Sequence, residues 1–72
     1  MAKDADGNVI KVGMVVGFKS DIEQEGKVVA IKRNFGRDVV VLEALSERGF
    51  TGDYIGGSMR TTEDPDRVWV ED

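Results

Sequence analysis

The chain has 72 residues and a net charge of −4 at neutral pH, and it contains neither cysteine nor histidine. A chain this short forms one domain at most and buries only about 60% of its unfolded surface, so its stability margin is narrow. Disulfides, the usual zinc sites and the common nucleophile–base pairs of catalysis are all excluded. We therefore expect one domain over residues 1–72, without enzymatic activity, cofactor or metal.

The charge is unevenly spread along the chain. Residues 1–37 hold seven Lys/Arg and five Asp/Glu, a net charge of +2, whereas residues 38–72 hold three and nine, a net charge of −6. A mildly acidic protein repels nucleic acid at long range, so any nucleic-acid role must depend on a local basic patch.

The amino-terminal residues 1–6 are polar and carry no apolar signal segment. The longest apolar runs in the chain are far shorter than the roughly 20 residues that span a bilayer. We expect a soluble cytoplasmic protein with no membrane partner, in which residues 1–6 are flexible.

Nine glycines and a single proline separate short apolar stretches, a pattern typical of an all-β barrel or sandwich. A turn at Asp6-Gly7-Asn8 precedes a first strand over about 14–19. In this strand Met14, Val16 and Phe18 should face one way and Val15 the other. Gly17 inside it suggests a bulge or a sharp bend.

The acidic segment 20–25 reads as a loop before a second strand over about 26–33. Residues 34–37 form a hairpin connection in which Gly36 is the expected left-handed residue. The return strand runs from Asp38 to about Ala44, and its β-branched run favours a central position in the sheet.

The carboxyl-terminal third is less regular. Residues 45–57 read as loop, 58–62 as a fourth strand, and the residues around Pro65 as a single 3₁₀ turn. In a last strand over 67–71, Val68 and Val70 should face inward and Trp69 outward.

Five strands, a hairpin between the second and third, and a tight turn before the last resemble the SH3-like small β-barrel. The KOW-type version of that fold is similar in its glycine and aliphatic spacing, and small barrels of phages and bacteria have similar openings. The matching residues are Gly13-x-Val15 and Gly26-x-Val28-x-x-Ile31, with Asp4-x-x-Gly7-Asn8 and Val12-Gly13-x-x-Val16. The resemblance implies a five-stranded SH3-like barrel over most of residues 7–71, a fold that hosts many unrelated functions.

Our leading hypothesis is a binding or assembly module that contacts another protein through an aromatic surface. This surface comprises Trp69, Tyr54, Phe50 and the loop around Gly52, rimmed by Asp53, Arg67 and Glu71. Tyrosine and tryptophan are enriched at binding hot spots. Two arrangements remain open: the three aromatic residues form a second small core, or Tyr54 and Trp69 flank a groove.

The alternative is a KOW-like module that binds RNA or duplex DNA through the basic hairpin 27–37. Its residues would be Lys27, Lys32, Arg33, Phe35 and Arg37, with the cations on phosphates and the aromatic ring stacked on a base. The same side chains would equally serve solubility or contact a protein. A third possibility is a weak homo-oligomer formed by pairing an exposed edge strand.

Acidic clusters give little sign of a metal site. The segment Asp4-Ala5-Asp6-Gly7-Asn8 lacks the spacing of an EF-hand loop, so we interpret it as an Asp-Gly turn. Only a weak cation site built with Asp64 and Asp66 is conceivable.

Overall fold

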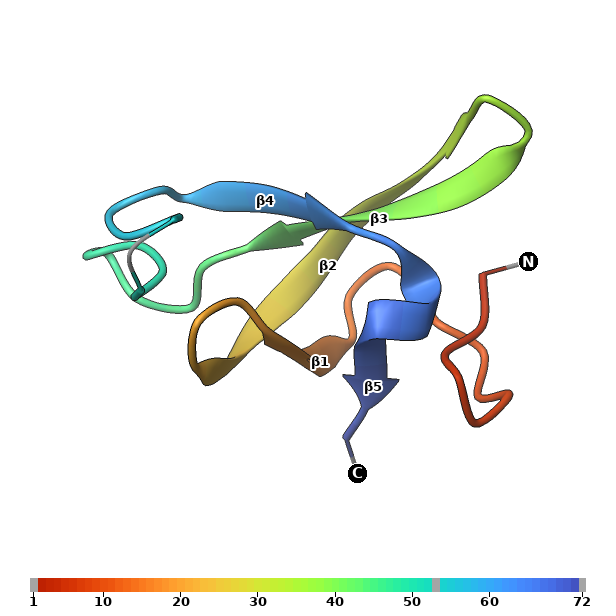
Figure 1. The fold of residues 1–72 in the computed structure, drawn as a ribbon, viewed down its shortest axis with the longest axis horizontal. Coiled ribbons are helices and arrows are strands. Elements are labelled where there is room, and N and C mark those ends of the chain that lie inside the picture. Colours follow the sequence, from red (N-terminus) through yellow and green to blue (C-terminus); the bar gives the residue numbers. More distant parts are fainter. Residues whose placement is uncertain (1, 53, 72) are drawn as a thin grey trace.

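The computed structural model describes residues 2–52 and 54–71 as an all-β chain of five strands and one 3₁₀ turn (Figure 1). This confirms the expected fold class and the single turn before the last strand. The elements are β1 (Val15–Lys19), β2 (Glu23–Asn34), β3 (Arg37–Glu43), β4 (Arg60–Glu63), η1 (Pro65–Arg67) and β5 (Val68–Val70).

The strands form one antiparallel sheet in the order β4-β3-β2-β1-β5. Within the described residues no pairing joins β4 to β5, so the sheet curls in the manner of a barrel without closing. The η1 turn carries the chain from one edge strand to the other (Figure 1). The described part holds no helix of the length and apolarity that a membrane crossing requires.

Alternation of side chains along the strands places the core on one face of the curled sheet. Val16 and Phe18 of β1 are buried, while Val15 is exposed, as the spacing predicts. β2, β3 and β5 contribute further aliphatic residues to the same cluster, namely Val28, Val40, Leu42 and Val68.

A β-bulge interrupts the pairing of β2 with β3. Val28 pairs with Leu42 and Ala30 with Val41, which leaves Val29 as the extra residue. Because of this insertion, Val28 is buried in the core and Ile31 packs against it, although three positions separate them.

Strand β2 begins at Glu23, earlier than expected, because Lys19 and Glu23 form the last pair of the β1–β2 ladder. The acidic segment that we expected to be a loop is therefore shortened to the bend at Ser20-Asp21-Ile22. The amide of Ser20 donates to the carbonyl of Ile22 across this bend (3.1 Å). The acidic side chains of β2 consequently lie on the sheet.

The amino-terminal segment from Ala2 onward packs on the domain, whereas Met1 lies outside the described residues. Ala2 and Ile10 are buried in the core cluster, and the amide of Ile10 donates to the carbonyl of Ala2 (2.9 Å). Between them, the carboxylate of Asp4 is buried and accepts a hydrogen bond from the amide of Val70 at the end of β5 (3.0 Å).

Candidate functional site

The aromatic residues of the predicted protein-binding surface lie in three different places. Phe50 is only 3% exposed and packs edge-on against Phe18 in the main core, with ring centroids 5.3 Å apart. Room for its ring comes from Gly26, where an added Cβ would lie 3.3 Å from the ring atoms of Phe50. Phe50 therefore belongs to the main core, and not to an exposed surface or to a second core. Asp53, the rim residue predicted nearby, lies outside the described residues.

The segment that carries Phe50 is held against β2 by one side chain that sequence reasoning missed. The amide group of Gln24 donates to the carbonyl of Thr51 (2.9 Å) and accepts from its backbone N–H (3.1 Å). It also donates to the hydroxyl of Ser20 (2.8 Å). The side-chain amide of Gln24 thus bonds the backbone of Thr51 in the way that a neighbouring strand would. These bonds hold the residue next to Phe50 in place, with the Phe50 ring in the core.

Tyr54 and Arg67 line one cavity of about 270 Å³ that does not include Trp69. Tyr54 is 87% exposed, so most of its ring is in solvent. The arrangement in which Tyr54 and Trp69 flank one groove is therefore not present, and each lies in a separate depression of the surface.

Trp69 lies across Gly17, its partner in the β1–β5 ladder. A Cβ at position 17 would collide with the indole ring of Trp69 and with the carboxylate of Glu71. Gly17 thus lets both side chains fold flat onto the outer face of the sheet. They border a groove of about 460 Å³, which we call the acidic groove; it is lined by Glu23, Gln24, Glu25, Leu45, Trp69 and Glu71.

Two carboxyl groups meet in the acidic groove. Glu25 lies opposite Gly17 in the β1–β2 ladder, and its side chain is hydrogen-bonded to that of Glu71. This contact with Glu25 is the main cause that raises the pKa of Glu71, and desolvation adds to it, while a hydrogen bond from Trp69 acts in the opposite direction. The groove therefore combines aromatic and aliphatic surface with a concentration of negative charge.

The second candidate surface is the tip of the β2–β3 hairpin, residues 32–37, which we call the hairpin tip. Its two-residue loop is Phe35-Gly36, and both residues have positive φ (52° and 81°). The left-handed conformation expected at Gly36 is confirmed, and Phe35 shares it. Phe35 is 97% exposed, the most exposed of the large hydrophobic residues in the described part of the chain.

The five residues of the predicted nucleic-acid site are only partly brought together. Residues that pair directly share a face of the hairpin. Arg37 pairs with Asn34 and therefore lies on the same face as Lys32, whereas Arg33 pairs with Asp38 on the other face. All three cations nevertheless flank Phe35.

Lys27 lies apart from the hairpin tip, on the far side of the bulge. It pairs with Glu43, which in turn forms an ion pair with Arg60 (3.4 Å). Lys27 thus lies beside charges of both signs and away from the hairpin tip, so it does not extend the basic surface of the hairpin.

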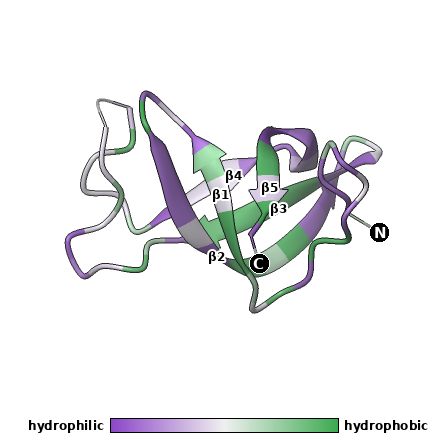
Figure 2. Cartoon of the chain, turned by 90° about the horizontal axis from the view of Figure 1, so that it is seen from below, coloured by the Kyte–Doolittle hydropathy of each residue, from purple (hydrophilic) through white to green (hydrophobic). Residues whose placement is uncertain are grey.

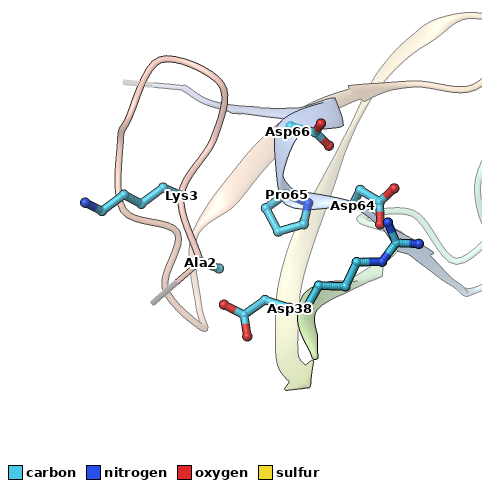
Figure 3. A pocket seen from close by; sticks show the side chains of 7 residues that line it. Ala2, Lys3, Asp38, Asp64, Pro65 and Asp66 are labelled. Atoms are coloured by element: carbon cyan, nitrogen blue, oxygen red, sulfur yellow. The ribbon is translucent and has the colours of Figure 1, made fainter. Parts of the chain in front are cut away.

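A further cavity of about 400 Å³ lies between the amino-terminal segment, the start of β3 and η1 (Figure 3). Its charges are mixed, because Lys3 and Arg37 share it with Asp38, Asp64 and Asp66. The described residues contain no group of three or more carboxylate, histidine or cysteine side chains that could hold a metal ion. The conceivable cation site at Asp64 and Asp66 therefore gains no support.

Comparisons with family models, with curated proteins and with solved structures found no significant match for this chain. The acidic groove was only partly predictable from the sequence, since Trp69 and Glu71 belong to the predicted surface but its other members come from β2 and from the loop at Leu45. Gly17 is the residue that could have indicated the groove. It faces outward in β1, and the outward-facing Trp69 of the neighbouring strand β5 lies over it.

Proposed function

We propose that the protein is a non-enzymatic binding module that engages another protein through its hairpin tip. The observation that carries this proposal is Phe35, a large aromatic residue that is 97% exposed and held in a left-handed backbone conformation. That conformation costs a non-glycine residue about 1–2 kcal/mol. Strained backbone persists where the surroundings over-determine it, and such positions cluster at functional sites.

The distribution of charge favours a protein partner over nucleic acid. Arg33 and the pair Lys32 and Arg37 lie on opposite faces of the hairpin, so they form no continuous basic stripe. Lys27 lies beyond the bulge and away from the hairpin tip, and the net charge of −4 opposes approach to a polyanion. An arginine-flanked aromatic residue is the composition typical of a protein-binding hot spot.

Nucleic-acid binding is the second candidate, favoured by Lys32 and Arg37 on one face beside an unstacked ring. It agrees with the resemblance to KOW-type, SH3-like barrels. Binding of this kind depends on phosphate contacts and weakens steeply with salt. Charge reversal at Arg33 and Arg37 would abolish it.

A photo-crosslinking amino acid at position 35 tests the proposal in cells that express the full chain. Tyr54 is the matched control position, since it is an exposed aromatic residue outside the hairpin. We expect a protease-sensitive protein adduct from position 35, none from position 54, and loss of the adduct on Arg33→Glu with Arg37→Glu. A nuclease-sensitive adduct would instead support the second candidate, and equal adducts from both positions, or none, would overturn both.

A further inference from the structure

We infer that the partner of the hairpin tip is a second copy of this chain, which receives Phe35 in its acidic groove. The inference rests on the proposed function, because it names the partner of the same hairpin tip. It describes a head-to-tail contact and not the pairing of exposed edge strands.

The two surfaces occupy opposite ends of one strand. β2 begins with Glu23 and Glu25, which line the acidic groove, and ends with Lys32 and Arg33 at the hairpin tip. Figure 1 shows the hairpin projecting away from the end where β2 begins, and both ends of β2 are hydrophilic around a hydrophobic middle in Figure 2.

The length of β2 prevents the hairpin tip from reaching the groove of its own molecule. Ten residues separate Glu23 from Arg33, which at 3.3 Å per residue is roughly 30 Å along a strand. A paired strand cannot fold back on itself over that distance, so the two surfaces can meet only between separate copies.

The chemistry of the groove matches that of the hairpin tip. A groove of about 460 Å³ bordered by Trp69 and by Leu45, which is 57% exposed, is large enough for one phenyl ring. Lys32 and Arg37, which share one face of the hairpin beside Phe35, would face the carboxylates of Glu23, Glu25 and Glu71. Trp69 adds the face of an indole ring, the best aromatic partner for a guanidinium group.

The carboxyl groups of Glu25 and Glu71 make the groove a favourable place for a positive charge. Glu25 and Glu71 line the same groove, so a single positive group placed there would interact with both. Arg33 and Arg37 supply such groups two residues before and two residues after Phe35.

The contact joins two different surfaces, so each copy keeps one free hairpin tip and one free groove. Such heterologous contacts generate open chains or rings. A hairpin tip in a groove makes a small interface, which places the association among weak and transient contacts. We therefore expect oligomers that grow gradually as the protein concentration rises.

Sedimentation equilibrium on the full chain, with two variants mixed, tests this inference. The tip variant carries Phe35→Asn and Arg37→Gln; the groove variant carries Glu25→Lys and Leu45→Lys. Lys11→Gln matches the charge change of −1 in the tip variant, and Asp6→Lys with Val12→Lys matches the change of +3 in the groove variant; all three positions are exposed and lie outside both surfaces. Circular dichroism checks that every variant is folded.

We expect the wild-type chain and both controls to show a mass that rises with concentration and falls with added salt, while each variant alone stays monomeric. Their equimolar mixture should form a 1:1 dimer that does not grow, since only one functional tip and one functional groove remain. A monomeric wild-type chain would overturn the inference, as would variants that associate as well as wild type, the result expected for edge-strand pairing.

The two proposals can fail separately. A wild-type chain that is monomeric but forms a crosslink from position 35 to a different protein would contradict self-association and leave the proposed function standing. A chain that associates equally with and without Phe35, and forms no crosslink from position 35, would contradict both.

Discussion

In this small domain without disulfides, the carboxylate of Asp4 links the amino-terminal turn to the end of β5. One oxygen accepts from the amides of Asp6 and Asn8 (3.0 and 2.8 Å), which closes the amino-terminal turn. The other accepts from the side chain of Asn8 and from the amide of Val70 (3.1 and 3.0 Å). These hydrogen bonds, led by that from Val70, lower the pKa of Asp4 although desolvation acts in the opposite direction.

We expect Asp4→Asn to lower the melting temperature at pH 7 by roughly 5–10 °C. Because the pKa of Asp4 is lower in the folded state, its carboxylate stabilises the fold fully above the ordinary value of 3.8. That contribution is lost as the pH falls through the lowered pKa. Melting curves from pH 7 to pH 2 should therefore converge for the two proteins at the acidic end.

Asp66→Asn, at an exposed carboxylate, is the matched control and should change the melting temperature little at any pH. A difference between Asp4→Asn and wild type that is constant from pH 7 to pH 2 would contradict the role of the charge. It would leave only a steric effect of the amide.

Gly17 makes a second residue-scale prediction. Gly17→Ala should cost about 1–3 kcal/mol of unfolding free energy, the usual cost of overpacking, because Trp69 and Glu71 occupy the space of the new methyl group. Displacement of the indole ring into solvent should shift its fluorescence to longer wavelength. Urea titration followed by tryptophan emission measures both effects.

Val15→Ala, on the same strand and exposed on the same face, is the control for Gly17→Ala. It should change the unfolding free energy by well under 1 kcal/mol and leave the emission maximum in place. If both variants behaved alike, the close approach of Trp69 to Gly17 would not be important for stability.

At the scale of elements, the strand pattern was largely predictable from the sequence. The β-branched run 39–41 lies in a central strand, and the Gly36 turn forms the hairpin, because both depend on local preferences. The start of β2 was misplaced because the pairing of Lys19 with Glu23 is a tertiary contact. The packing of residues 2–6 was missed since Asp4 finds its partner at the other end of the chain.

The hairpin itself carries a conflict between stability and binding. Phe35→Asn should stabilise the protein by about 0.5–1 kcal/mol, because asparagine followed by glycine suits a two-residue hairpin turn in which both residues have positive φ. The same substitution should abolish the crosslinking and self-association proposed above. Urea denaturation and sedimentation on one preparation would measure both.

Phe35→Ala separates the two effects, since it removes the ring without favouring the left-handed backbone. It should lose binding to the same degree without the gain in stability. A Phe35→Asn variant that is less stable than wild type would show that the ring of Phe35 contributes to the fold.

At the scale of the whole molecule, one core unites the sheet with the loop after β3. Phe50 enters that core beside Phe18, whereas Tyr54, a few residues further along, remains in solvent. Phe50→Ala should therefore cost about 3–5 kcal/mol, which is comparable to the entire stability of a domain of this size. Tyr54→Ala should be nearly neutral, and thermal unfolding of the two variants would compare them directly.

The candidate surfaces were only partly predictable, for reasons of geometry. The exposed ring of Phe35 followed from a turn signal in its own hairpin. The sequence suggested that the glycine-rich loop packs over Trp69 and so brings Phe50 and Tyr54 next to it. In the structure, the space at Gly26 and the hydrogen bonds of Gln24 direct Phe50 into the core instead. Which aromatic residue a loop buries depends on partners in other strands, which no local pattern reveals.

The extra residue of the bulge, Val29, affects the direction in which the hairpin projects and therefore the position of Phe35. Its removal would leave the flanking pairs, Val28 with Leu42 and Ala30 with Val41, in their present register. It would remove the bend that the insertion imposes on the strand. The ladder would survive, while the direction in which the outer half of the hairpin leaves the sheet would change. A single deletion could thus re-aim Phe35 without altering any side chain around it.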